Sequence, residues 1–394
     1  MKILLITNIY PYNRNLEKDK NSRALHNIIK LWDSDVEVIR PLFFPRELKG
    51  GINAGVFQRK RKFLIDNIGV KAIPIWKIPA TNVYFYNTLI KYVRNNKIDP
   101  DIIISHRLHS SIGAARLAKI KKKPFILGIH NSDISSIQKN EMKDFFFDIF
   151  NQADRIACRS QSILNEVMRI YPDFSHKCFI AFSGIEKEII TPLKDNLEKM
   201  QEWKMKKRPI QFISVARLKK LKNIDVNLKA LANLNSNIKW EYTIIGDGEE
   251  MSRLKGLAKE LKIIDKVIFM GYQTREKVLH YMQKSDIFIM VSAPETFGLV
   301  YIEAMAKGCL VIGAYDNGID GVVEDGTNGF LCRPRNNAEV SEKIEAIFDM
   351  DCSRITGILS HSNQTIKNYT EEKASSTYMK KIKEAQKANY NGKI

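Results

Sequence analysis

Short runs of consecutive apolar residues alternate with longer stretches of helical pattern along the whole chain. This alternation is typical of α/β domains, in which parallel strands are buried on both faces and separated by helices. Helices are predicted at 22–31, 80–95 and 111–120 in the first half. Strands are predicted at 3–6, 36–39, 102–104, 125–128, 155–157 and 178–181, and then at 210–214, 240–245, 267–270, 287–291 and 310–313.

The alternation stops once and then restarts, which indicates two doubly wound domains. A chain of 394 residues is also longer than one compact domain of ordinary size. Residues 191–209 are polar and lack a strand pattern, so we interpret them as a linker between a domain at 1–190 and a domain at 210–370. A final helix is predicted within 371–394.

The formal charge of +19 predicts anionic partners. Basic residues gather at 59–62, 119–123 and 204–208 without interleaved aromatic residues, which favours an anionic membrane surface over nucleic acid. Solvated lysine faces are the alternative. The five scattered cysteines form no CxxC pair, no apolar run reaches about 18 residues, and no signal peptide is recognisable. We therefore expect a cytoplasmic protein, peripheral at the inner face of the membrane.

The strongest local signal is the segment 286–308. An apolar strand is followed by the loop 292–295 and by a helix predicted at 297–307, with Thr296 as its cap and Gly308 as its end. Ligands of open α/β sheets bind beyond the carboxyl ends of strands, and a helix start offers N–H groups to phosphate. Gly298 would let a ligand approach the backbone closely.

Charged residues flank this helix start and follow the first strand of the second domain. Glu295 and Glu303 are about 10 Å apart along a helix axis, a spacing that suits the two ends of a sugar nucleotide. Glu303 has an alternative partner in Lys307 at i,i+4. Arg217 and Lys222 follow the strand at 210–214 and would clamp a diphosphate, unless they are only a basic turn.

These segments resemble family 4 of the retaining glycosyltransferases, which have the GT-B fold. The resemblance rests on E-T-F-G-L-x-x-x-E-A-M-A-x-G at 295–308 and A-R-L-x-x-x-K at 216–222. Further matches lie at 153–160, 183–185, 245–248, 269–271 and 324–329. The family implies two Rossmann-like domains facing across a cleft, with the C-terminal helix returning to the first domain.

The resemblance also implies roles for individual residues. Arg217 and Lys222 would bind the donor diphosphate, Glu303 the ribose, and Glu295 with the amides of 297–299 the sugar and phosphate. His130 would reach the donor sugar from the first domain. The candidate catalytic residues are Arg217, Lys222, Glu295 and His130. The candidate donor-binding residues are Gly246, Gly271, Tyr272, Phe297, Gly298, Leu299 and Glu303, and the acceptor-side candidates are Tyr10, Asn21, Ser22 and His109.

The chain departs from the family pattern at several positions. The loop 10–23 lacks the usual glycines, Asn131 follows His130, Asn223 follows Lys222, and Asp320-Gly321 replaces a Pro-Glu pair. These departures affect the acceptor side and the identity of the donor sugar.

Other patterns in the sequence resemble cofactor or metal motifs, but we interpret none of them as such a site. The G-x-G that begins at Gly246 meets Met251 where a nicotinamide-binding motif needs glycine. The two D-x-D segments, at 33–35 and 349–351, are interpreted as polar turns, and His106 and His109 lack a third metal ligand at useful spacing. No cofactor and no metal are expected.

The sequence therefore predicts a retaining, metal-independent transferase. It would move a hexose from a UDP- or GDP-linked donor to a glycan or lipid-linked acceptor, in surface polysaccharide or lipopolysaccharide synthesis, with the two domains closing about the linker. The alternatives are another GT-B enzyme, such as an epimerase or phosphorylase, and a non-catalytic basic surface-binding module.

Overall fold

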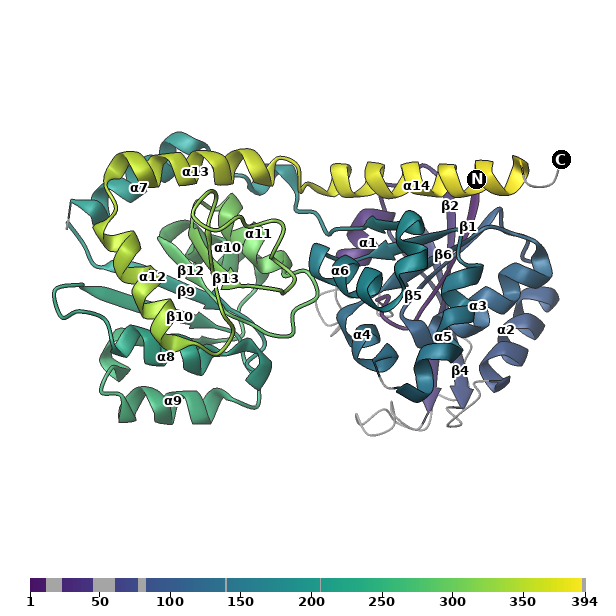
Figure 1. Cartoon of the computed structure of the whole chain (residues 1–394), viewed down its shortest axis with the longest axis horizontal. Coiled ribbons are helices and arrows are strands. Elements are labelled where there is room, and N and C mark those ends of the chain that lie inside the picture. The colour runs from purple at the N-terminus through teal and green to yellow at the C-terminus, as the bar shows by residue number, and fades with distance from the viewer. Residues whose placement is uncertain (12–22, 45–60, 77–82, 139, 206, 392–394) are drawn as a thin grey trace. The chain divides into compact units, whose positions relative to one another are not determined.

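The computed structural model describes residues 1–11, 23–44, 61–76, 83–138, 140–205 and 207–391. The chain divides into two compact units, each an α/β unit built on a largely parallel sheet (Figure 1). Unit 1 comprises Met1–Gly184 and Glu371–Ile394, and unit 2 comprises Ile185–Thr370. None of the described helices combines the length and apolar character needed to cross a membrane.

Unit 1 contains an eight-stranded sheet with the order β3-β4-β2-β1-β5-β6-β7-β8. Its strands are β1 (Lys2–Thr7), β2 (Asp35–Phe44), β3 (Arg61–Ile65), β4 (Ile68–Trp76), β5 (Ile102–His106), β6 (Phe125–Ile129), β7 (Arg155–Cys158) and β8 (Cys178–Ile180). Neighbouring strands run parallel except β3 and β4. The strand order reverses between β1 and β5, where open α/β sheets place their ligands.

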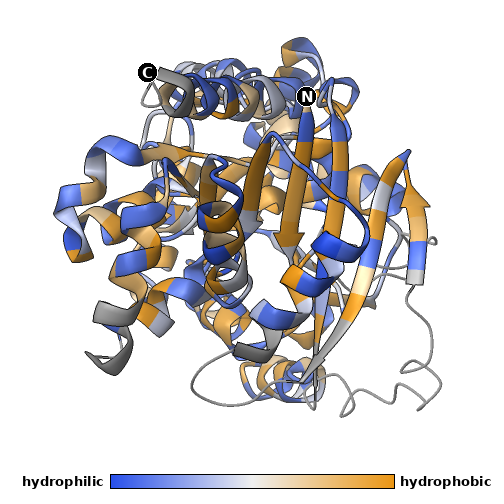
Figure 2. Cartoon of the chain, turned by 90° about the vertical axis from the view of Figure 1, so that its right-hand side faces the viewer, coloured by the Kyte–Doolittle hydropathy of each residue, from blue (hydrophilic) through white to orange (hydrophobic). Residues whose placement is uncertain are grey.

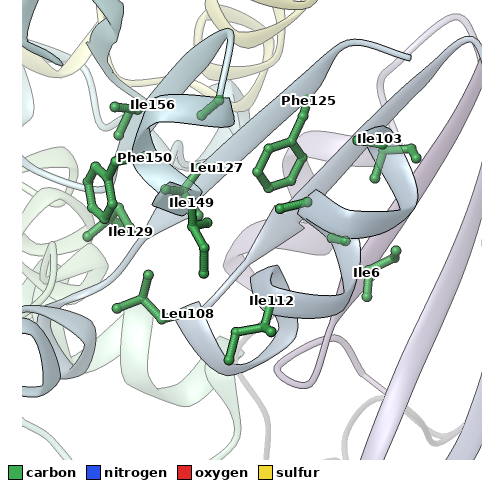
Figure 3. Close-up of a cluster of buried hydrophobic side chains, with 14 of the residues drawn as sticks. Ile6, Ile103, Leu108, Ile112, Phe125, Leu127, Ile129, Ile149, Phe150 and Ile156 are labelled. Carbon is green, nitrogen blue, oxygen red and sulfur yellow. The ribbon is translucent and has the colours of Figure 1, made fainter. Parts of the chain in front are cut away.

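The central strands of unit 1 carry apolar residues on both faces, and Figure 2 shows these strands as largely hydrophobic. Along β1, Leu4 and Ile6 enter one core while Ile3 and Leu5 enter the other. Figure 3 shows the first core, in which strand side chains such as Leu127 pack with side chains of the helices over this face. The helices of unit 1 are α1 (Ala24–Ile29), α2 (Val83–Asn95), α3 (Leu108–Lys121), α4 (Asn131–Ile137), α5 (Asn140–Gln152), α6 (Gln161–Ile170) and α14 (Glu371–Asn391).

The last helix, α14, belongs to the second core of unit 1 (Figure 1). Its Tyr378 and Ile382 are fully buried there, and the α1 side chain of Asn27 donates a hydrogen bond to Glu371 at 2.7 Å. Burying a side chain of this size contributes about 1.5–3 kcal/mol. The predicted return of the C-terminal helix to the first domain is confirmed.

Unit 2 contains a six-stranded sheet, parallel throughout, with the order β11-β10-β9-β12-β13-β14. Its strands are β9 (Ile210–Val215), β10 (Trp240–Ile245), β11 (Val267–Gly271), β12 (Ile287–Ile289), β13 (Leu310–Ala314) and β14 (Phe330–Cys332). Its helices are α7 (Leu193–Lys204), α8 (Ile224–Ala232), α9 (Met251–Glu260), α10 (Arg275–Lys284), α11 (Leu299–Ala306), α12 (Asn337–Asp349) and α13 (Cys352–Ile366). The order reverses between β9 and β12.

The segment predicted as a linker is instead helix α7, which packs in unit 2. Met200 and Trp203 on one face of α7 are each 3% exposed. Lys199 donates hydrogen bonds to the carbonyls of Ser285 at 2.7 Å and Lys307 at 3.2 Å. The polar composition of 191–209 therefore reflects a helix with one narrow buried face, and the boundary between the units falls at 184/185.

Candidate functional site

Lys222 and Glu295 meet at the carboxyl edge of the unit 2 sheet. Lys222 lies in the 3₁₀ turn Lys220–Lys222, which follows β9, and Glu295 lies in the loop that follows β12. Lys222 Nζ donates a hydrogen bond to Glu295 Oε2 at 2.6 Å, and the two side chains are 19% and 15% exposed. Because β9 and β12 are neighbours at the reversal of strand order, their loops meet where such sheets bind ligands.

The turn that carries Lys222 is fixed against the loop after β12. The side-chain amide of the buried Asn223 donates to the carbonyl of Val291 at 2.7 Å. The backbone N–H of Ala293 donates to the carbonyl of Leu221 at 3.0 Å. Asn223 has a φ of 51°, a left-handed conformation that asparagine tolerates better than most residues. Its departure from the family pattern thus has a structural reason.

The carboxylate of Glu295 has further hydrogen bonds that fix its orientation. Ser292 Oγ donates to Oε2 at 3.1 Å, and the backbone N–H of Thr296 donates to Oε1 at 3.0 Å. The backbone N–H of Glu295 itself donates to Asn317 Oδ1 at 3.1 Å. These hydrogen bonds fix the Glu295 side chain within the loop.

Helix α11 begins at Leu299, so the predicted cap at Thr296 is wrong. Gly298 is the N-cap, with a φ of 80°, and a Cβ there would come within 2.5 Å of the Tyr301 ring. Glycine is required by this left-handed turn and this contact. Phe297 is 4% exposed, so this predicted donor-binding residue packs into the interior of unit 2. The first N–H groups of α11 lack intrahelical partners and lie at the carboxyl end of β12.

Glu303, on α11, pairs with Arg275 rather than with Lys307. Arg275, at the start of α10, donates to Glu303 Oε1 from Nη2 at 2.9 Å and to both carboxylate oxygens of Glu186 at 2.6 and 2.5 Å. Burial raises the pKa of Glu303, while the positive charge of Arg275 lowers it. Arg275 therefore favours the ionised form of Glu303, the form that accepts hydrogen bonds from two hydroxyls.

The other predicted donor residues follow β9, β10 and β11. The side chain of Arg217 is exposed just after β9. A Cβ at Gly246 would lie 1.8 Å from the Ala216 carbonyl oxygen, and Gly246 N–H donates to the Gly271 carbonyl at 2.8 Å. Tyr272 follows at once and is 74% exposed. These residues and Lys222 lie at the same carboxyl edge of the unit 2 sheet, so we treat them as one candidate site.

In unit 1, His130 lies at the carboxyl end of β6 and contacts His106. His106 Nδ1 is 3.1 Å from His130 Nε2, and His106 Nε2 is 3.1 Å from the Tyr378 hydroxyl. Burial lowers the pKa of His106 to about 3. Burial, His106 and the positive charges of Arg159 and Arg107 hold the pKa of His130 well below its usual value. Both imidazoles are therefore neutral near pH 7.

Of the predicted acceptor-side residues, the structure describes Tyr10 and His109. The ring of Tyr10 is fully buried and its hydroxyl is 2.6 Å from His26 Nδ1, so its assignment to an acceptor contact differs from the structure. The phenol lies in the second core, three residues after β1 ends. His109 lies in the first turn of α3 and is partly buried. Asn21 and Ser22 lie outside the described residues.

Two family models match successive parts of the chain. The model described as Glycosyltransferase Family 4 matches residues 50–188, and that described as Glycosyl transferases group 1 matches residues 195–371. The chain belongs to glycosyltransferase family 4.

Relatives and solved structures agree with this assignment. This glycosyltransferase is 25% identical to the N-acetyl-alpha-D-glucosaminyl L-malate synthase of Bacillus anthracis, over 83% of this chain and 85% of that one. It is 28% identical to the alpha-monoglucosyldiacylglycerol synthase of Acholeplasma laidlawii, over 69% and 74%. Its fold matches the crystal structure of Anabaena HepE in complex with UDP, with a TM-score of 0.73, 18% identity and coverage of 98% and 100%. The predicted GT-B fold is confirmed.

Two contacts of this glycosyltransferase had not been predicted from its sequence. Arg275 forms ion pairs with both Glu303 and Glu186, and the hydroxyl of Tyr378, in the last helix, lies 3.1 Å from His106 Nε2. No motif marks these residues. The signal for Arg275 is its place directly after the loop 272–274, which follows β11 at the same sheet edge as Lys222.

Proposed function

We propose that this glycosyltransferase moves a hexose, with retention and without a metal, from a UDP- or GDP-linked donor to a glycan or lipid-linked acceptor. The observation that carries the proposal is the meeting of Lys222 and Glu295 where the strand order of unit 2 reverses. Cationic, carboxylate and helix-start groups converge at this edge. A nucleotide diphosphate sugar offers phosphate oxygens to the cations and the helix start, and hydroxyl groups to the carboxylates.

The cations would stabilise the leaving diphosphate. As the bond between the anomeric carbon and the phosphate oxygen breaks, negative charge grows on the phosphate, and Arg217, Lys222 and the first N–H groups of α11 would meet it. Lys222 would then exchange part of its contact with Glu295 for the phosphate. Glu295, freed in part, would accept hydrogen bonds from hydroxyls of the transferred sugar.

The nucleoside would be held farther along the same edge. Glu303, kept ionised by Arg275, would accept hydrogen bonds from the ribose hydroxyls. The exposed ring of Tyr272 would cover the base by stacking. Neither contact chooses between uracil and guanine.

Retention requires that the new bond form on the face that the diphosphate leaves. The acceptor hydroxyl oxygen would bond to the anomeric carbon, and its proton would pass to the departing phosphate oxygen. Charge and atoms balance without a protein nucleophile. His130, neutral near pH 7, would donate or accept one hydrogen bond to the sugar.

A membrane-associated acceptor is supported by the charge of +19 and by relatives that include an alpha-monoglucosyldiacylglycerol synthase. We accordingly place the enzyme at the cytoplasmic face of the membrane, in surface polysaccharide synthesis.

The direct test incubates the protein with a panel of UDP- and GDP-hexoses and candidate lipid-linked acceptors. Transfer predicts release of nucleoside diphosphate with formation of a glycoside whose anomeric configuration, read by NMR, equals that of the donor. An inverted product would contradict retention. An isomerised sugar, or a sugar phosphate, would replace transfer by epimerase or phosphorylase chemistry.

A further inference from the structure

Arg159 is a buried guanidinium with no carboxylate partner among the described residues. It follows β7, is 3% exposed, and donates one hydrogen bond, from Nη2 to Ser183 Oγ. Its Nη1 is buried without a hydrogen-bond partner in the described part of the chain. An arginine stays charged at physiological pH, and a buried charge without a counterion costs several kcal/mol.

The groups around Arg159 do not neutralise it. The positive charge of Arg159 acts on the pKa of His106, His130 and Tyr378, all of which are neutral near pH 7. No carboxylate of the described residues is among the groups that shift the pKa of Arg159, and Asp133, which accepts a hydrogen bond from the His130 backbone, is ion-paired with Arg107 at 3.4 Å. The cluster therefore carries a net positive charge.

The cluster stands where an α/β sheet binds ligands. His106 ends β5, His130 follows β6, Arg159 follows β7 and Ser183 follows β8, so all four lie at the carboxyl edge of the unit 1 sheet. His130 and Arg107 are partly exposed, and the side chain of Arg107 is 27% exposed. An anion that reaches these two residues lies near the charge of Arg159, across an interior that screens it weakly.

We propose that this edge of unit 1 binds a phosphate or carboxylate group of the acceptor, with Arg159 supplying the charge and His130 and Arg107 meeting the ligand. The inference rests on the proposed transferase function and adds the chemical class of the acceptor. The diphosphate of the donor is the other source of the same chemistry. The experiment must separate the two sources.

The test measures the melting temperature of the full chain against inorganic phosphate at constant ionic strength, with UDP or GDP saturating to occupy the donor site. Wild type should be stabilised in a saturable way, because a ligand that binds only the folded state raises its stability. Arg159→Gln should bind phosphate at least about tenfold more weakly, a loss of about 1.4 kcal/mol. Glycerol 3-phosphate should act as phosphate does, and glycerol should not.

The matched controls fix the interpretation. Arg169→Gln, on the exposed end of α6, should keep the wild-type phosphate response. Arg159→Gln should keep the wild-type response to UDP and, without phosphate, should melt no lower than wild type, because it removes an uncompensated charge. Arg159→Lys should retain most of the affinity.

Several results would overturn the proposal. They are an unchanged phosphate response in Arg159→Gln, no response in wild type, or failure of Arg159→Gln to fold, which would make Arg159 a structural residue. A parallel loss of UDP binding would assign the anion to the donor instead. A chain that responds to phosphate but to no nucleotide would contradict the proposed function and leave the anion subsite standing.

Discussion

Lys222 Nζ lies 2.6 Å from Glu295 Oε2, although 73 positions of sequence separate the two residues. The pair joins the loops after two neighbouring strands of unit 2. A cation held this way is preorganised, since its position does not have to be fixed when the substrate arrives. The pair also keeps Lys222 from being an unpaired charge at a site where it is only 19% exposed.

Replacing Lys222 should therefore damage transfer more than folding. We expect Lys222→Gln to lower kcat by roughly 10²–10³, the usual effect of losing one preorganised electrostatic contact to a developing charge. Steady-state kinetics with the active donor measure this. Lys220→Gln, an exposed residue of the same turn, is the matched control and should match wild type. Equal rates for the two variants would remove Lys222 from the mechanism.

Arg275 should set the pH at which the donor is bound. Burial raises the pKa of Glu303 and Arg275 lowers it, so Arg275→Gln should raise that pKa further. A carboxyl with a raised pKa is protonated at higher pH and then accepts fewer hydrogen bonds. As the pH is lowered, the donor KM should begin to rise at a higher pH in the variant than in wild type. The kcat at saturating donor should change little. Arg253→Gln should leave the profile in place. An unshifted profile in Arg275→Gln would show that Arg275 does not act through Glu303.

Arg208 should be a major stabilising residue of unit 2. It donates to both oxygens of Asp286 at 2.6 and 2.8 Å, and the Asp286 side chain is fully buried. Removing one partner of a buried pair leaves an uncompensated charge and costs about 3–5 kcal/mol. Arg208→Met should lose this much free energy of unfolding in urea, whereas Arg169→Met, from an exposed pair, should lose almost none. A loss as small as that control would mean that Asp286 is satisfied by other groups.

His106 should make unit 1 sensitive to acid. Its pKa is lowered from 6.5 to about 3 by burial, so the unfolded chain takes up the proton first as pH falls. Its contribution to stability is complete above about pH 6.5 and is lost from there toward pH 3, at about 1.4 kcal/mol per pH unit. His106→Asn should flatten the fall in unfolding free energy between pH 6.5 and 4.5 that wild type shows. The control His176→Asn, at an exposed position, should keep the wild-type fall. Equal slopes of unfolding free energy against pH in wild type and both variants would show that His106 does not contribute to the acid sensitivity.

Much of the fold was predictable because a buried parallel strand is a run of apolar residues. Such a run can be recognised in the sequence without knowing which strands it pairs with. Strands β1 and β12 carry the apolar runs 3–6 and 287–291, and every residue of these runs is buried. The β3–β4 hairpin was missed, although Asp66 and Asn67 stand alone between two apolar runs. Their φ values of 45° and 65° are those of the tight turn that such a pair favours.

Other features were not accessible from the sequence, because they depend on contacts between distant segments. Helix α7 was taken for a linker since its buried face consists of little more than Met200 and Trp203. The partner of Glu303 was sought four residues away, at Lys307, whereas Arg275 lies 28 residues away. Residue spacing in the sequence identifies only ion-pair partners that are close along the chain. A long-range ion pair is fixed by sheet order, which brings α10 and α11 together.

The central claim is that unit 2 binds a nucleoside diphosphate through Arg217 and Lys222, and calorimetric titration of UDP and GDP tests it most directly. Wild type should bind one of the two nucleotides, and Arg217→Ala/Lys222→Ala should bind it at least about tenfold more weakly, with an unchanged melting temperature in the absence of nucleotide. Equal affinity in the folded double variant would contradict the account.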